Sequence, residues 1–221
     1  MDYQSKGTEK EMTSRITKLC RLASITIALL LSGIVHSNDS DTNEFTLNGT
    51  EWEKVALQHE LDPYLLYAVA LAESASGRGD QGDKMISPWP WTLRTLKDRY
   101  YGLSEQETKV HLMKMVEASG ELVDVGLMQV NFHWHKDKVS SIEALLDPKT
   151  NLQVGAEILR TAIKSAPNDL ELGIGRYHHW KDQDRARNFG SRVMAIWKNI
   201  KPESTLTILR TLLCSDSTIA T

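Results

Sequence analysis

The chain has 221 residues, of which 41% are hydrophobic and 25% are charged, and its formal net charge at pH 7 is −3. This is the composition of an ordinary globular protein that is long enough for one sizeable hydrophobic core. The small negative charge, with no basic block in the body of the chain, argues against nucleic acid as the main ligand.

The first 37 residues have the pattern of an export signal, in which a basic flank precedes a short apolar run. The run covers residues 22–35 and is shorter than the roughly 20 residues of a membrane-spanning helix. Cleavage is expected after Ser37. We therefore expect a periplasmic protein with no stable membrane span once the signal is cleaved. A retained signal anchor is the alternative, and Met12 is an alternative start.

Beyond the signal, the sequence predicts one mainly α domain. Residues 38–50 predict a polar linker, residues 51–201 the domain, and residues 202–221 a loosely held C-terminal tail. Glycines and prolines make residues 80–122 an irregular central insertion, in which Ser104 begins a capping-box pattern. Apolar residues recur with helical spacing in six segments, which are residues 51–59, 62–77, 110–118, 148–165, 169–180 and 183–200.

The segment 62–77 places one carboxyl group near the end of an apolar helix. Asp62 is suited to cap this helix, and Pro63 is suited to its first position. Glu73 continues the apolar stripe that is formed by Leu66, Val69 and Ala70. Glycines follow and predict the end of the helix. Glu73 is therefore expected to point towards the core, close to the C-terminal end of its helix.

Burial and the negative end of the helix dipole both disfavour the ionised form of a carboxyl group at this place. General acid catalysis near neutral pH needs a group that keeps its proton. Glu73 is therefore the candidate catalytic acid. The alternative is a glutamate at the edge of the stripe, which reaches solvent or pairs with a cation such as Arg78.

Two tryptophans, Trp89 and Trp91, alternate with prolines in the central insertion. This alternation predicts an extended backbone that displays two large rings at close spacing. The rings are suited to stack on sugar faces or to dock a partner protein. A third interpretation is that they cover the core from a loop.

Four segments carry a resemblance to a known family when they are taken in order. They are Glu73-Ser74, Gly126-Leu127-Met128-Gln129-Val130-Asn131, NLQVGAEIL at residues 151–159 and GRYHHW at residues 175–180. Together they resemble the catalytic domain of lytic transglycosylases of the soluble-lytic-transglycosylase (SLT) type, over about residues 52–200. The resemblance implies a single catalytic domain with a mainly α, lysozyme-like fold.

The resemblance also implies the roles of individual residues. Glu73 would be the sole catalytic acid and base, and Ser74 would help to position it. Residues 126–129 would line the glycan cleft, and Tyr177 would hydrogen-bond to the acid. Asn151 and Gly155 match a part of the pattern that is structural in the family.

By this resemblance the substrate is the peptidoglycan glycan strand, and the product carries a 1,6-anhydromuramoyl end. Gln129 and Asn131 are suited to bind acetamido groups or hydroxyls, and Met128 is suited to form an apolar floor. No cofactor is expected. Small exported transglycosylases of this type resemble those that open the cell wall for conjugation or secretion machinery, and the central insertion is a candidate docking surface for such a partner.

The sequence departs from the family at three places. The gap from Glu73 to Gly126 is longer, His178 takes the place of an asparagine, and Asp124 precedes the GLMQ segment where small residues are usual. Asp124 is read as a solvated turn residue or a helix cap. If instead it lies at the cleft, a second carboxylate could hold a water molecule and make the enzyme a hydrolytic muramidase.

Two further interpretations complete the sequence analysis. Paired histidines can bind zinc, but the nearby acids and Cys214 do not complete a known spacing, so no metal site is expected at His133, His135, His178 and His179. A chain of lysozyme-like fold can also be a binding module that grips glycan or a partner protein without turnover. The presence of Glu73 together with Gln129 and Tyr177 favours the enzyme, because packing alone does not require this set.

Overall fold

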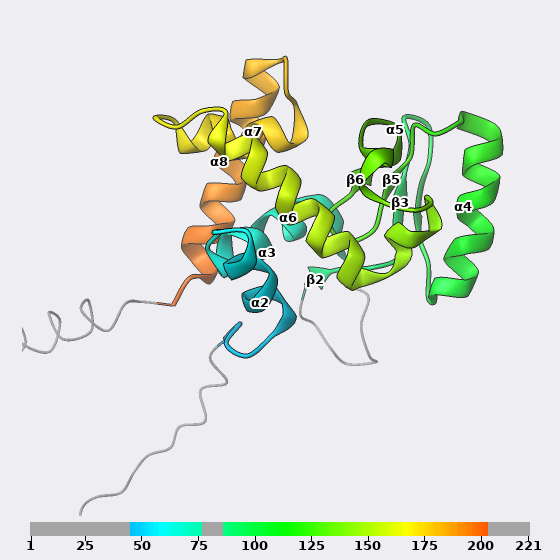
Figure 1. Ribbon diagram of the computed structural model, residues 1–221, viewed down its shortest axis with the longest axis horizontal. Coiled ribbons are helices and arrows are strands. Elements are labelled where there is room, and N and C mark those ends of the chain that lie inside the picture. Colours follow the sequence, from blue (N-terminus) through cyan, green and yellow to red (C-terminus); the bar gives the residue numbers. More distant parts are fainter. Residues whose placement is uncertain (1–44, 77–85, 203–221) are drawn as a thin grey trace, which may run out of the picture. The chain divides into compact units, whose positions relative to one another are not determined.

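The computed structural model describes residues 45–76 and 86–202 (Figure 1). Within these ranges the helices are α2 (Glu51–Gln58), α3 (Pro63–Ser74), α4 (Glu105–Ser119), α5 (Phe132–His135), α6 (Pro148–Lys164), α7 (Leu170–His178) and α8 (Gln183–Ile200), with the short 3₁₀ helices η1 (Lys136–Lys138) and η2 (Glu143–Leu146). The strands are β1 (Ala75–Ser76), β2 (Ser87–Pro88), β3 (Thr92–Arg94), β4 (Arg99–Tyr101), β5 (Asp124–Val125) and β6 (Val130–Asn131). The fold is mainly α, as the sequence predicts.

The strands form two small antiparallel sheets. β1 pairs with β2 directly after α3, and the other four strands have the order β4-β3-β5-β6. Leu93 on β3 lies opposite Val125 on β5, which lies opposite Val130 on β6, and all three are buried. Because neighbouring side chains of a strand point to opposite faces, the remaining residues of these strands lie on the other face of the sheet.

The helical core is centred on α3, which is apolar on most of its surface. Its buried apolar side chains are Leu65, Leu66, Ala68, Val69 and Ala70. α3 packs against α8, and α7 packs against both α6 and α8. In Figure 1, α4 lies beside the strands, whereas α7 and α8 are packed together. Glu73 lies at the C-terminal end of α3, where β1 follows, and it contacts the four-stranded sheet through Arg94 on β3.

The central insertion is regular in its described part, so the prediction of an irregular segment over residues 80–122 is wrong from residue 86 onwards. These residues form β2, β3, β4 and α4. Each strand has only two or three residues, too few for a visible alternation of apolar and polar residues. The capping-box prediction is confirmed, because the Ser104 hydroxyl accepts a hydrogen bond from the Glu107 N–H at 3.2 Å. α4 therefore begins at Glu105, before the predicted helical residues 110–118.

The predicted linker is wrong for Phe45 to Thr50. The Phe45 ring lies 5.1 Å from the Tyr67 ring on α3, Leu47 is buried, and Thr50 caps α2. The predicted signal, the rest of the linker at residues 38–44 and the tail at residues 203–221 lie outside the described residues. Within residues 45–76 and 86–202, no helix has the length and apolar character needed to span a bilayer.

Asp62 fixes the start of α3, as predicted, and also joins α3 to α8. Its Oδ1 accepts hydrogen bonds from the N–H groups of Tyr64 and Leu65 at 2.9 and 3.1 Å, and from Trp197 Nε1 at 3.1 Å. Lys201 Nζ donates to Oδ2 at 2.9 Å. Burial is the largest single influence and would raise the pKa of Asp62, but the hydrogen bonds from Lys201, Leu65 and Trp197 together lower it.

Replacing Asp62 by alanine is expected to destabilise the fold by about 2 kcal/mol at pH 7, because a helix cap and two charge-assisted contacts are lost. A folded-state pKa below the unfolded value stabilises the fold above about pH 4, and this stabilisation disappears as the pH falls through the folded pKa. Urea unfolding of wild type and Asp62→Ala should therefore differ less at pH 3 than at pH 7. Asp137→Ala, at an exposed aspartate, is the control and should show a small difference at both pH values.

Candidate functional site

Glu73 lies in the last turn of α3 and is 8% exposed, so the prediction that it points towards the core is confirmed. Its Oε2 accepts a hydrogen bond from Arg94 Nη2 on β3 at 3.1 Å. Its Oε1 lies 3.0 Å from His178 Nδ1 at the end of α7. Three elements that are distant in sequence therefore converge on one buried carboxyl group. Its cationic partner in the structure is Arg94, whereas Arg78 lies outside the described residues.

Arg94 also contacts Asp124, because the sheet register places the two residues opposite each other on β3 and β5. Arg94 Nε lies 3.5 Å from Asp124 Oδ2. On the next strand, Asn131 is paired with Asp124 in the register, and its Nδ2 donates to Asp124 Oδ1 at 2.8 Å. The polar face of the sheet thus carries Arg94, Asp124 and Asn131 in a row across three strands.

Asp124 is partly buried in strand β5, so its interpretation as a solvated turn residue or helix cap is wrong. Burial raises the pKa of Asp124, and the negative charge of Glu73 adds to this rise. The hydrogen bond from Asn131 and the charge of Arg94 oppose the rise without cancelling it. Two carboxyl groups therefore influence each other at this site, and a single guanidinium touches both.

Sequence reasoning missed Arg94. The residue follows the tryptophan pair in a strand of only three residues, and a single arginine in such a strand carries no motif. The sequence does contain a weak hairpin signal here. Polar residues separate two short segments at 92–94 and 99–101, and these two segments pair as β3 and β4 in the structure. The link to Glu73 and Asp124 depends on the sheet register, which no local pattern reveals.

The GLMQ segment, residues 126–129, forms the tight connection between β5 and β6. Gly126 and Gln129 have positive φ values of 81° and 47°. Gln129 Nε2 donates to the carbonyl oxygens of Thr92 and Gly126 at 3.0 and 2.9 Å, and its Oε1 is buried without a hydrogen-bond partner in the described structure. Because Nε2 is fully used within the protein, only Oε1 of this side chain is left to accept a hydrogen bond from a ligand.

Ser74 and Met128 are completely buried, so neither can contact a bound substrate in this structure. The Ser74 hydroxyl donates to the Leu127 carbonyl at 2.6 Å and thereby ties the end of α3 to residues 126–129. Ser74 is therefore not a substrate-binding residue, and its contact suits a residue that positions the Glu73 helix. The Met128 side chain packs against Gly155 of α6, and Leu127 is only 7% exposed.

Tyr177 does not form the predicted hydrogen bond to Glu73. Its single hydroxyl proton is donated to the Met128 carbonyl oxygen at 2.5 Å. Burial raises the pKa of Tyr177 well above its usual value, and the charges of Glu73 and Asp124 add to this rise. Tyr177 is therefore a neutral donor that holds the GLMQ segment against α7.

Asn151 and Gly155 have the structural role that the resemblance implies, because they join α6 to the same segment. Asn151 is completely buried, accepts a hydrogen bond from the Met128 N–H, and donates to the carbonyl oxygens of Val125 and Leu145. A Cβ atom at Gly155 would lie 2.5 Å from Met128 Cβ, so only glycine allows this close approach. The second and third segments of the resemblance thus pack directly on each other.

His178 has a second contact besides Glu73. Its ring stacks on the Phe189 ring of α8 at a centroid distance of 4.6 Å and an interplanar angle of 7°. This stacking fixes the orientation of the imidazole and therefore the direction from which Nδ1 approaches Glu73. His178 occupies the position where the family more often has an asparagine, and it supplies a titratable group there.

Trp89 and Trp91 lie beside each other but do not form a flat platform. Their ring centroids are 5.7 Å apart at an interplanar angle of 90°, so the edge of one ring meets the face of the other. The predicted extended backbone is correct for β2 and wrong for Pro90 and Trp91, which form a turn. Trp89 Nε1 donates to the Gly102 carbonyl at 2.8 Å, which anchors this turn.

The His179 ring lies 5.3 Å from the His178 ring, whereas His133 and His135 belong to the short helix α5. His133 Nδ1 lies 3.8 Å from Glu121 Oε2, and burial lowers the pKa of His135. Among residues 45–76 and 86–202, the side chains of histidine, cysteine, aspartate and glutamate form no group of three or more that could hold a metal ion.

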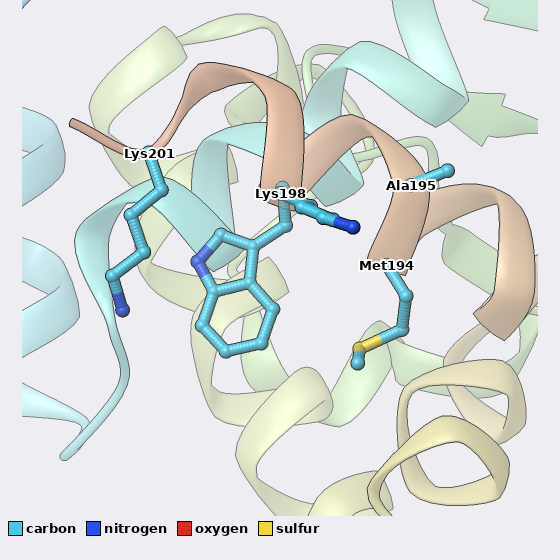
Figure 2. Close-up of a pocket in the computed structure, with 5 residues that line it drawn as sticks. Met194, Ala195, Lys198 and Lys201 are labelled. Carbon is cyan, nitrogen blue, oxygen red and sulfur yellow. The ribbon is translucent and has the colours of Figure 1, made fainter. Parts of the chain in front are cut away.

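A shallow apolar pocket lies at the C-terminal end of α8, as Figure 2 shows, and is lined by Met194, Ala195, Trp197, Lys198 and Lys201. Trp197 and Lys201 both hydrogen-bond to Asp62, at the N-terminal end of α3. Glu73 is eleven residues further along the same helix, about 16 Å away at 1.5 Å per residue. This pocket is therefore separate from the Glu73 site.

Comparison with known proteins identifies the family. No curated protein and no solved structure matches the chain. The family model described as "Transglycosylase SLT domain" matches residues 50–192, which is well over half of the chain and includes the Glu73 cluster and all four segments of the resemblance. The chain therefore belongs to the transglycosylase SLT domain family, and its activity is of the lytic transglycosylase type that acts on peptidoglycan.

Proposed function

We propose that this protein cleaves the β-1,4 bond between N-acetylmuramic acid and N-acetylglucosamine in peptidoglycan, with Glu73 as acid and then as base. The observation that carries the proposal is the Glu73 carboxyl group, which is buried at the meeting point of α3, β3 and α7. A buried acid held by side chains from separate elements is typical of catalytic sites, because ordinary packing does not require it.

The chemistry needs one proton donor and a group that stabilises the positive charge at the anomeric carbon. Glu73 donates its proton to the leaving glycosidic oxygen. The acetamido carbonyl oxygen of the muramic sugar supplies the stabilisation, in a substrate-assisted route that needs only one acid. The Glu73 carboxylate then removes the proton from the C6 hydroxyl while this oxygen bonds to the anomeric carbon. The product is a 1,6-anhydro sugar, Glu73 regains its proton, and no water is consumed.

Gln129 Oε1 and Asn131 Oδ1 support this assignment, because both are buried acceptor atoms without a hydrogen-bond partner among the described residues. Either atom could accept a hydrogen bond from the amide N–H of an acetamido group once the neighbouring side chains move, because neither atom is accessible in this structure. Leaving a buried acceptor unpaired costs about 1–3 kcal/mol, so a ligand that pairs it gains affinity.

A hydrolytic muramidase is the second candidate, and the place of Asp124 favours it. Asp124 shares Arg94 with Glu73, and a second carboxylate near the acid can hold and activate a water molecule. The two reactions differ in the fate of water, since hydrolysis adds one oxygen atom from water to the new sugar end and anhydro formation adds none.

The expected result is an anhydro product without solvent oxygen. Purified sacculi are digested with the wild-type protein in water enriched in oxygen-18, and the released muropeptides are analysed by mass spectrometry. Anhydro ends without label support the transglycosylase. Reducing ends that carry one labelled oxygen contradict it and assign hydrolysis, and Asp124→Asn should then abolish the labelled product.

The proposal extends to the place and purpose of the reaction. The signal-like residues 1–37 support export to the periplasm, where peptidoglycan lies. Resemblance to small exported transglycosylases supports local opening of the cell wall for a conjugation or secretion system. Fractionation of cells that produce the full chain, with the protein detected in the periplasmic fraction, tests the first part.

A further inference from the structure

Arg94 lies between the two carboxyl groups of the site. Its Nη2 is 3.1 Å from Glu73 Oε2, and its Nε is 3.5 Å from Asp124 Oδ2. The Glu73 side chain is 3% exposed, whereas those of Arg94 and Asp124 are 26% and 27% exposed. One guanidinium thus serves two carboxyl groups, of which the more buried one is the proposed catalytic acid.

The charges of this cluster do not balance if both carboxyl groups are ionised. With a neutral His178 beside Glu73 Oε1, two carboxylates and one guanidinium leave one negative charge in a partly buried site, and uncompensated buried charge is costly. A single proton shared by the two carboxyl groups removes this charge. Such a pair titrates as a unit, and the proton can lie on either member. Burial and the charge of Glu73 raise the pKa of Asp124, which is the direction that favours its protonated form.

We infer that Arg94 determines which of the two carboxyl groups holds the shared proton. When the guanidinium contacts Glu73, the proton lies on Asp124. When the guanidinium contacts Asp124 alone, the proton lies on Glu73, which is then ready to act as the acid. In the change from the first form to the second, Asp124 releases one proton to water and Glu73 takes one proton from water. The net charge of the cluster is therefore the same in both forms.

Among the residues that the structure describes, the other titratable groups that face the pair come from α7. His178 approaches Glu73 Oε1, the oxygen that Arg94 does not contact, and Tyr177 is a neutral hydroxyl whose proton is donated to Met128. The contact between His178 Nδ1 and Glu73 Oε1 can persist in both forms, because Arg94 uses Oε2. Arg94 is therefore a positioning residue, which acts on the reaction through Glu73.

The placement of the proton is tested without substrate, by carbon-13 NMR titration of the side-chain carboxyl groups in the full chain. The Asp124 signal is assigned by its loss in Asp124→Asn. In wild type, Asp124 should titrate above the ordinary value of about 3.9. Arg94→Gln should move this titration up by about one pH unit or more, because a cation within contact distance is lost. Glu73→Gln should move it down, because a neighbouring negative charge is lost.

Arg99→Gln is the matched control, since Arg99 lies opposite Arg94 in the sheet register but is exposed. It removes the same charge from the neighbouring strand and should move the Asp124 titration much less, because solvent screens exposed charges. A titration of Asp124 at or below about 3.9 in wild type would overturn the inference. An equal effect of Arg94→Gln and Arg99→Gln would also overturn it.

The consequence for catalysis rests on the proposed function and is tested by the pH dependence of glycan release. Arg94→Gln should move the alkaline limb of the rate profile to higher pH, because the cation beside the acid is lost. Asp124→Asn should move the limb to lower pH, because Arg94 then has Glu73 as its only carboxylate partner in this cluster. Arg94→Lys keeps the charge and should restore the wild-type limb. A purely structural role of Arg94 would lower the rate at every pH without moving the limb.

The two tests separate the inference from the proposed function. If wild type releases no product, the proposed function fails, and the NMR titration still decides where the proton lies. If wild type is active but Asp124→Asn leaves the alkaline limb unchanged, the inference fails and the proposed function stands.

Discussion

Glu73→Gln is expected to lower the rate of glycan release by about 10²–10⁴-fold, the usual contribution of a general acid. Glutamine has nearly the same shape as glutamate and can still accept a hydrogen bond from Arg94 or His178, so the site keeps its packing. It cannot donate a carboxyl proton to the glycosidic oxygen or later accept one from the C6 hydroxyl. The measurement is the initial rate of soluble muropeptide release from sacculi at a fixed enzyme concentration.

Glu117→Gln on α4 is the matched control, because it makes the same change at an exposed glutamate and should leave the rate unchanged. Thermal unfolding of both variants establishes that the fold is intact. Release by Glu73→Gln at the wild-type rate would show that another group is the acid. If neither wild type nor the variant releases product and both still bind sacculi, the chain is a binding module that uses the lysozyme-like fold without turnover.

The helices of this fold could be predicted because their ends carry strong local signals. Asp62 and Pro63 open α3, and Asp147 and Pro148 open α6, each aspartate accepting hydrogen bonds from the first turn of its helix. α6 and α8 also have one buried and one solvated face. The strands lack both kinds of signal, since a strand of two or three residues shows no period and is held by tertiary pairing.

The site could be predicted only as far as its residues lie in recognisable segments. Glu73 and Gln129 follow from the stripe on α3 and from the GLMQ segment, and both are buried as a site of this kind requires. Arg94 could not be predicted, because its contact with Glu73 depends on the pairing of β3 with β5. The predicted hydrogen bond from Tyr177 to Glu73 is wrong for a related reason. Tyr177 donates to the Met128 carbonyl instead, and the position of this carbonyl depends on how residues 126–129 fold.

Asn151→Ala is expected to destabilise the fold by about 3–5 kcal/mol, the largest stability effect expected of any single change at this site. The Asn151 side chain is completely buried and pairs with three backbone groups, the N–H of Met128 at 2.8 Å and the carbonyl oxygens of Val125 and Leu145 at 2.8 and 2.9 Å. Alanine leaves the buried Met128 N–H without its partner and removes the side-chain donor from both carbonyl oxygens. Each buried group that loses its partner costs about 1–3 kcal/mol.

The measurement is urea unfolding of Asn151→Ala beside Asn168→Ala, which changes an exposed asparagine in the loop between α6 and α7 and should have little effect. Because Asn151 holds the GLMQ segment, the variant should also release glycan more slowly under conditions where it is still folded. A loss of stability below about 1 kcal/mol would mean that water enters and satisfies the three groups. The segment next to Glu73 would then be held chiefly by Tyr177 and Ser74, and substitutions at those two residues should have the larger effect on activity.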